Sequence, residues 1–129
     1  MTYSKEELAK YRLERAHESL EEAGVMSSLK HWNTAASRLY YSCFYAASAY
    51  LVLHSINAST HAGIKTAFNK HLIKEGKLAS KFGQLYNELF ALRQDADYRD
   101  YRDLTEEKIN ELFPETKALV IALEKLIET

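Results

Sequence analysis

The chain has little of what builds a disulfide-linked or loop-rich protein. Its 129 residues include one cysteine, one proline and four glycines. The lone Cys43 excludes an internal disulfide framework and favours a reducing cytosol, so we expect a cytoplasmic protein. Scarce glycine and proline disfavour an all-β or loop-rich fold. The polar N-terminus has no resemblance to a signal peptide.

A strong charge of one sign and a long apolar run are also missing. The net charge is -1, so no overall positive field attracts nucleic acid, and any such contact must be local. The longest apolar run, residues 39–53, is shorter than a membrane span and contains serines and tyrosines. We read it as a buried helix and expect no membrane contact. The length predicts one domain over residues 1–129.

The sequence does contain apolar residues that recur at helical spacing. Ser4 to Glu7 is a capping box that starts a first helix, and Gly24 is expected to end it. A second helix, from about residue 28 to 54, is apolar on more than one face, which predicts a central position. Its alanines and serines allow another helix to approach closely.

Three further helices complete the pattern. Thr60 caps a short helix over about 61–72, and residues 74–77 form a turn. A fourth helix follows, and Thr105 starts the last one. Pro114 lies inside the last pattern, so we expect a kink or break there. The sequence therefore predicts an all-α, up-and-down bundle of four long helices plus one short helix.

One arginine interrupts the central apolar helix. Arg38 lies between Ala36 and Leu39. A buried guanidinium needs acceptors, because an unpaired buried charge is costly. The aspartates that follow the fourth helix are candidate partners, and a phosphate is the alternative. Nearby tyrosines such as Tyr41 lie in core or interface, or stack on bases.

Charges of both signs crowd residues 93–103, which read RQDADYRDYRD. Such a stretch is either an ion-paired surface or a site. Arg93 and Asp97 are four residues apart and share a face if the segment is helical. The five histidines of the chain show no spacing typical of metal ligands, so no metal and no cofactor are expected.

Three blocks resemble the HEPN superfamily, in particular small stand-alone bacterial and archaeal members. They are AASRLYYSCFYAASAYL, THAGIKTAFNKHLIKEGKL and LRQDADYRDY, within a resemblance that spans about residues 5–127. The resemblance implies a bundle of four or five helices, usually a homodimer. It also implies a frequent partner, a minimal nucleotidyltransferase, which serves as antitoxin where the HEPN protein is a ribonuclease toxin.

The family motif is an arginine followed, after four to six residues, by a histidine. By resemblance, Arg93 matches the arginine, but Tyr98 stands at the shortest histidine position and no histidine follows His71. In some members a tyrosine two positions beyond the histidine is adenylylated. That position is Asp100 here, so Tyr98 and Tyr101 are displaced candidates. Arg12 and His17 have the motif spacing too, but lie on the first helix.

The missing histidine affects the expected chemistry. Metal-independent RNA cleavage needs a proton acceptor, and tyrosine, which titrates near pH 10, is a poor one at neutrality. His61 is one histidine from elsewhere in the chain, but nothing in the sequence places it beside Arg93. We therefore expect Arg93 to line an open cavity with no imidazole nearby.

The preferred hypothesis is a binding module with a degenerate nuclease motif that binds nucleotide or RNA in a polar groove and pairs with a nucleotidyltransferase. The alternatives are an active ribonuclease toxin and a purely structural helical protein. The candidate catalytic residues are Arg93 and Tyr98. The candidate ligand-binding residues are Arg38, Tyr41, Asp95, Asp97 and Tyr101.

Overall fold

The computed structural model describes residues 2–98 and 104–129, without the side chains of residues 95–98. The described residues form helices and no strand. The helices are α1 (Lys5–Ser28), α2 (Trp32–Leu53), α3 (His61–Phe68), the π-helical η1 (Asn69–Lys74), α4 (Ser80–Tyr98) and α5 (Glu106–Glu128). The predicted all-α bundle of four long helices and one short helix is therefore confirmed.

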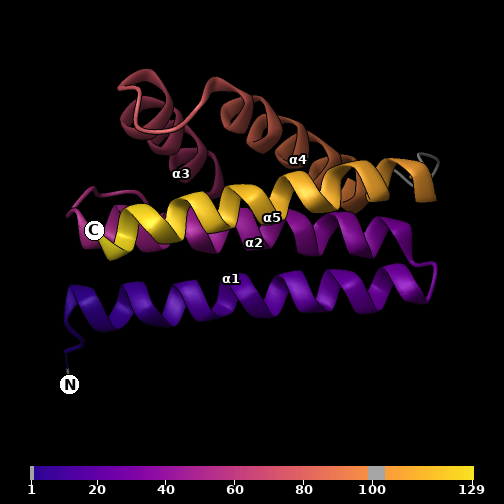
Figure 1. Ribbon diagram of the computed structural model, residues 1–129, viewed down its shortest axis with the longest axis horizontal. Helices are drawn as coiled ribbons and strands as arrows, with labels where there is room; N and C mark the ends of the chain where they lie inside the picture. Colours follow the sequence, from indigo (N-terminus) through magenta and orange to yellow (C-terminus); the bar gives the residue numbers. More distant parts are fainter. Residues whose placement is uncertain (1, 99–103) are drawn as a thin grey trace.

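Helices α1, α2 and α5 run along the longest axis of the molecule, and α4 is inclined to it (Figure 1). In Figure 1, α1, α2 and α5 lie along this axis, and α3 and α4 lie on the side opposite α1. Both termini lie at the same end of the bundle. Helix α2 contacts α1, α3, α4 and α5, so its predicted central position is confirmed.

The start of α1 follows the prediction and its end does not. The Ser4 hydroxyl accepts a hydrogen bond from the Glu7 amide, and the Glu7 carboxylate accepts one from the Ser4 amide, which completes the capping box. The helix passes through Gly24 to Ser28, and the chain turns at Lys30, where φ is 62°. Gly24 faces Phe113 at ordinary contact distance, and a glycine inside a helix is only mildly unfavourable. Helix α2 accordingly begins four residues later than expected.

The segment after α3 approaches α4 closely. Thr60 caps α3 as predicted, and Gly76, with φ of 77°, lies in the expected turn. A methyl group on Gly83 of α4 would lie 2.9 Å from Asn69 Oδ1 and 3.1 Å from Ile73 Cγ1. Glycine at position 83 therefore allows η1 and α4 to pack at this separation.

Pro114 does not break the last helix. Helix α5 continues from Glu106 to Glu128, and its ribbon is uninterrupted in Figure 1. Leu112 before the proline and Leu119 after it are both fully buried, so packing on either side holds the helix together. The expected break is wrong because this apolar stripe outweighs one lost backbone hydrogen bond.

No described helix has both the length and the apolar character needed to cross a membrane.

Candidate functional site

Arg93 lies on α4 at the edge of the core, where it meets two tyrosines of α2. Its guanidinium donates a hydrogen bond from Nη2 to the Tyr41 hydroxyl at 3.2 Å. Its Cζ atom lies 5.5 Å from the centre of the Tyr40 ring and 5.6 Å from that of the Tyr41 ring. Arg93 and Tyr41 are half-buried, whereas Tyr40 is fully buried. The cation is thus held by aromatic side chains close to solvent.

An imidazole lies against the same two tyrosines. His61 is the first residue of α3, and its Nδ1 lies 2.7 Å from the Tyr40 hydroxyl. Its ring centre is 5.8 Å from the ring centres of both Tyr40 and Tyr41. It also stacks on Phe44, with ring centres 4.5 Å apart and planes 20° from parallel. Three aromatic rings of α2 therefore fix the orientation of His61.

We call Tyr40, Tyr41, Phe44, His61 and Arg93 the Arg93 cluster. In this cluster α2 supplies the aromatic rings, α3 supplies the imidazole and α4 supplies the guanidinium. Burial raises the pKa of Tyr40 to about 12, an effect that nearby Arg93 partly opposes. Tyr40 therefore remains a neutral phenol at physiological pH.

More cations lie on rings next to this cluster. The Arg38 guanidinium lies 4.8 Å from the Tyr41 ring centre, and the Lys65 ammonium lies 4.4 Å from that of Phe90. Arg15 of α1 lies 5.3 Å from the ring centre of Tyr45. Cations and rings arranged in this way are suited to phosphates and bases of a single-stranded nucleic acid.

Arg38 is less buried than the sequence predicts. Its side chain is 30% exposed, and its Nη1 lies 3.6 Å from Glu22 Oε1 on α1. Because the guanidinium reaches past the apolar helix to the bundle surface, it needs no fully buried partner. The described partners of Arg38 are therefore a glutamate of α1 and the ring of Tyr41.

The remaining predicted site residues lie at the edge of the described structure. Asp95, Asp97 and Tyr98 belong to the last turns of α4, and their side chains are outside the described part. Tyr101 lies outside the described residues altogether. Their proposed roles therefore remain predictions.

The expectation of a site without an imidazole differs from the structure. His61 and Arg93 come from different helices and contact the same two tyrosines because α3 and α4 both pack on α2. No sequence spacing connects residues so far apart. The usable signal was the Thr60 cap, which makes His61 the first residue of a helix, but it does not say what that helix contacts.

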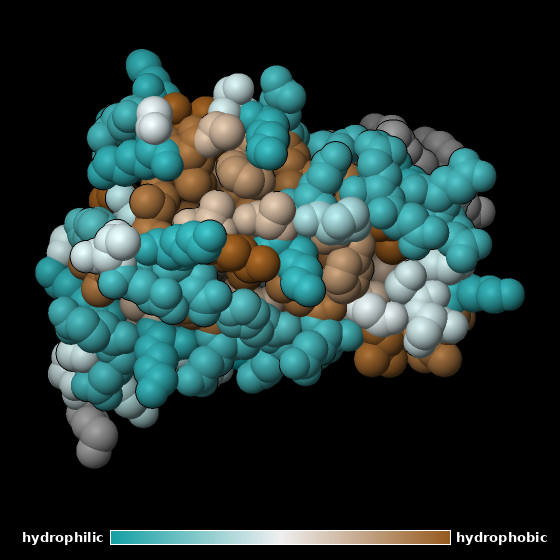
Figure 2. All heavy atoms as spheres, viewed as in Figure 1, coloured by the Kyte–Doolittle hydropathy of each residue, from teal (hydrophilic) through white to brown (hydrophobic). Residues whose placement is uncertain are grey.

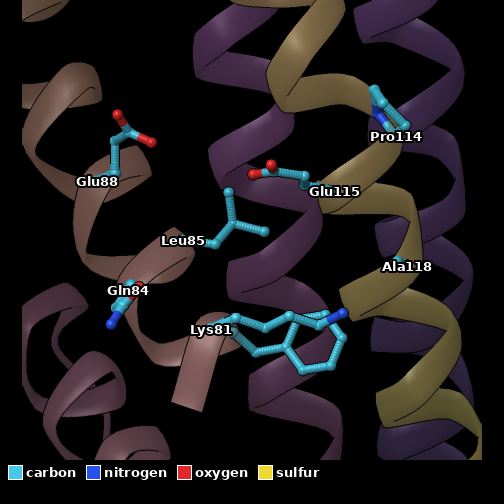
Figure 3. Close-up of a pocket in the computed structure, with 8 residues that line it drawn as sticks. Lys81, Gln84, Leu85, Glu88, Pro114, Glu115 and Ala118 are labelled. Carbon is cyan, nitrogen blue, oxygen red and sulfur yellow. The ribbon is translucent and has the colours of Figure 1, made fainter. Parts of the chain in front are cut away.

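A separate groove of about 580 Å³ lies between α4 and α5. Figure 3 shows that Leu85 and Glu88 of α4 and Pro114 and Ala118 of α5 border it. In Figure 2, apolar residues gather where α3 and α4 approach α5, with hydrophilic side chains around them. Arg38, Tyr41 and Arg93 do not line this groove, so it is distinct from the Arg93 cluster.

The motif-like pair on the first helix does not form a site of its own. Arg12 Nη1 donates to the Ser48 carbonyl oxygen of α2 at 3.4 Å. His17 Nε2 lies 3.2 Å from Glu124 Oε2 of α5. The two side chains thus contact different helices.

Comparison with known proteins agrees with the resemblance stated above. The model of the HEPN domain matches residues 9–126. The chain belongs to the HEPN family. A UPF0332 protein of Thermotoga maritima is 33% identical over 124 residues, which cover 96% of this chain and 94% of that protein.

Two archaeal relatives of this HEPN chain have functional names. "Putative toxin MJ0142" of Methanocaldococcus jannaschii is 37% identical over 94 residues, which cover 73% of this chain and 63% of that protein. "Putative toxin MJ0605" of the same organism is 28% identical over 116 residues, which cover 90% of this chain and 86% of that protein. The HEPN domain described here is thus similar to proteins named as toxins.

Proposed function

We propose that this HEPN protein is the toxin-type member of a two-protein pair and that it binds phosphate groups of RNA or nucleotide at the Arg93 cluster. The observation that carries the proposal is the half-buried guanidinium of Arg93 on the rings of Tyr40 and Tyr41. A planar guanidinium presents several donors that match phosphate oxygens. The adjacent rings offer faces on which bases stack.

The similarity to proteins named as toxins supports the same proposal. A structural protein needs neither a cation on two rings near solvent nor further cations beside it. Arg38 and Lys65 extend the basic character of this surface although the whole chain is close to neutral. Binding is therefore expected to be local and sensitive to salt.

Binding is tested by fluorescence anisotropy with a labelled single-stranded RNA, and with ATP and GTP as competitors. Arg93→Ala should weaken RNA binding and its salt dependence, because one phosphate contact is lost. Lys117→Ala, an exposed position on α5, is the control with the same charge change. Wild-type protein that binds neither RNA nor nucleotide, or an Arg93 variant that binds as well as wild type, would contradict the proposal.

We further propose a minimal nucleotidyltransferase as the protein partner and a homodimer of this chain. Half-buried aromatic residues of α2 and α4, among them Tyr41, Tyr45 and Phe90, are available for such contacts. Tyr98 and Tyr101 are the candidate acceptors of a nucleotide from the partner. Co-expression with a minimal nucleotidyltransferase, followed by light scattering and intact mass, tests complex, dimer and modification together. A monomer that neither binds the partner nor gains mass would contradict this part.

A further inference from the structure

A cavity distinct from the groove between α4 and α5 lies at the end of the bundle that carries both termini. It has a volume of about 630 Å³ and is lined by the end of α2, the turn after η1 and the end of α5. Figure 1 shows these ends of α2 and α5 side by side. We call this cavity the terminal pocket, and its lining residues are Tyr50, Leu53, His54, Lys77, Leu126, Ile127 and Thr129. It shares no residue with the Arg93 cluster, so the two are separate features of the molecule.

The walls of the terminal pocket are mostly apolar. Leu53 of α2 and Leu126 and Ile127 of α5 are half-buried, so each presents part of an aliphatic side chain to the cavity. Cavities of about 300–1,000 Å³ with apolar walls and a few polar groups are the usual sites of small organic ligands. A free inorganic anion would leave this apolar surface in contact with water. The size and the walls therefore point to a ligand with an aliphatic body.

The polar groups of the pocket meet at Tyr50. Lys77 Nζ donates a hydrogen bond to the Tyr50 hydroxyl at 3.2 Å, and the His54 ring packs on the Tyr50 ring with centres 4.2 Å apart. Tyr50 is only 3% exposed, so its phenol is held in place. Within the described part of the chain, the Tyr50 hydroxyl proton has no acceptor and the His54 ring nitrogens have no hydrogen-bond partner. An ammonium, a phenol and an imidazole therefore keep hydrogen-bonding capacity at one place.

Lys77 is available for an anion. It is exposed and forms no ion pair with any residue that the structure describes. Glu75 lies two residues earlier, but its Oε2 is 3.2 Å from His71 Nδ1. The hydrogen bond with Tyr50 raises the pKa of Lys77, so the ammonium stays charged at physiological pH. The lining residues thus contribute one ammonium and no carboxylate side chain, which complements a ligand with a single negative charge.

From these observations we infer that the terminal pocket binds a monocarboxylate with an aliphatic tail, the chemistry of a fatty acid. The carboxylate accepts hydrogen bonds from the Lys77 ammonium and the Tyr50 hydroxyl, and the His54 imidazole lies beside it. The tail covers the aliphatic walls that α2 and α5 contribute. Charge-assisted hydrogen bonds fix the head group, and removal of apolar surface from water stabilises the tail. This inference is independent of the function proposed above.

Isothermal titration calorimetry with octanoate as the probe tests the inference. Three matched compounds separate the parts of the ligand: octanol has the tail without the charge, acetate has the charge without the tail, and inorganic phosphate is a different anion. Wild-type protein should bind octanoate more tightly than any of the three. In the amide spectrum of the labelled protein, octanoate should shift the signals of residues 50–54, 77 and 126–127.

Two substitutions and a matched control locate the binding energy. Lys77→Met removes the ammonium but keeps an unbranched side chain, so it should weaken octanoate binding on the order of 10-fold and leave octanol binding unchanged. Leu126→Ser makes one wall polar and should weaken octanoate and octanol alike. Lys117→Met, at an exposed position of α5 outside the pocket, has the same charge change as Lys77→Met and should bind as wild type does. Circular dichroism checks that each variant is folded.

Several results would overturn the inference. One is wild-type protein that does not bind octanoate, and another is equal affinity for octanol, acetate or phosphate. Unchanged octanoate affinity in Lys77→Met would show that the ammonium does not hold the carboxylate. Amide shifts confined to the Arg93 cluster would place the anion at the other site and would likewise overturn it.

Discussion

The two sides of the bundle around α2 bury different kinds of side chain. On the α1 side, α1 contributes small buried residues such as Ala9, Ala16 and Ala23, which let two helices approach closely. On the α3–α4 side, the rings of Tyr40, Tyr41 and Phe44 meet a half-buried imidazole and guanidinium. Charged side chains border both sides, but among the described residues it is on the second side that an imidazole and a guanidinium contact the same two tyrosines.

This difference separates stability from function. Small apolar side chains stabilise a close helix pair by shape and by removal of apolar surface from water. Exposed or half-exposed cations on rings contribute on the order of 0.5–1 kcal/mol each, so they are weak stabilising elements. Substitutions on the α1 side should therefore affect unfolding, and those in the Arg93 cluster should mainly affect ligands.

Apart from the control substitution at Leu39 described below, the largest effect on stability is expected from enlarging a small residue in the core. Ala46 of α2 is fully buried, so Ala46→Leu should destabilise the protein by about 1–3 kcal/mol through overpacking. Urea unfolding measures the change. Ala91→Leu, at an exposed position of α4, is the control. Equal stability of the two variants would mean that the core around Ala46 has room for a larger side chain.

Tyr40→Phe should have an intermediate effect at neutral pH. Losing the hydrogen bond to His61 should cost about 0.5–1.5 kcal/mol.

The pH dependence gives a second test of Tyr40. Burial raises its pKa in the folded state to about 12, against about 10 in the unfolded chain. Wild-type stability should therefore fall as pH rises from about 10 through about 12, because the unfolded state loses the proton more readily. Tyr40→Phe lacks this contribution, so the stability difference between the two proteins should shrink above pH 10. A constant difference would show that Tyr40 ionises equally in both states.

A pair of glycine substitutions compares the two sides directly. Gly24→Ala in α1 should stabilise by about 0.5–1 kcal/mol, since the new methyl group would lie 3.8 Å from Phe113 Cζ. Gly83→Ala in α4 should destabilise, because its methyl group would lie 2.9 Å from Asn69 Oδ1. Thermal unfolding of both variants measures the shifts. A stabilised Gly83 variant would mean that η1 moves away from α4 at little cost.

The smallest effect on stability is expected at Arg38. Its side chain is 30% exposed and lies 3.6 Å from Glu22, so Arg38→Met should change the free energy of unfolding by less than about 1 kcal/mol. A loss of several kcal/mol in urea unfolding would instead mean that the guanidinium is needed to hold helices together. Leu39→Ala at the next, fully buried position should cost about 2–5 kcal/mol and serves as the control.

Local patterns predicted the elements well where a short-range interaction defines them. The Ser4–Glu7 capping box, the Thr60 and Thr105 caps and the Gly76 turn are all present. The predicted helix end at Gly24 and the predicted break at Pro114 were wrong, because packing decides there and both helices continue. Single residues that weaken a helix are overridden when apolar residues on both sides of them are buried.

By itself, the sequence determined the all-α class, the apolar α2, the family and the candidate cation Arg93, because all of these are encoded in periodicity or in contiguous motifs. Only the tertiary structure decided which other side chains would contact the tyrosines that hold this cation. His61 and Arg93 are placed on the same tyrosines because α3 and α4 both pack on α2. Such a meeting depends on helix packing angles and separations, which no spacing along the chain specifies.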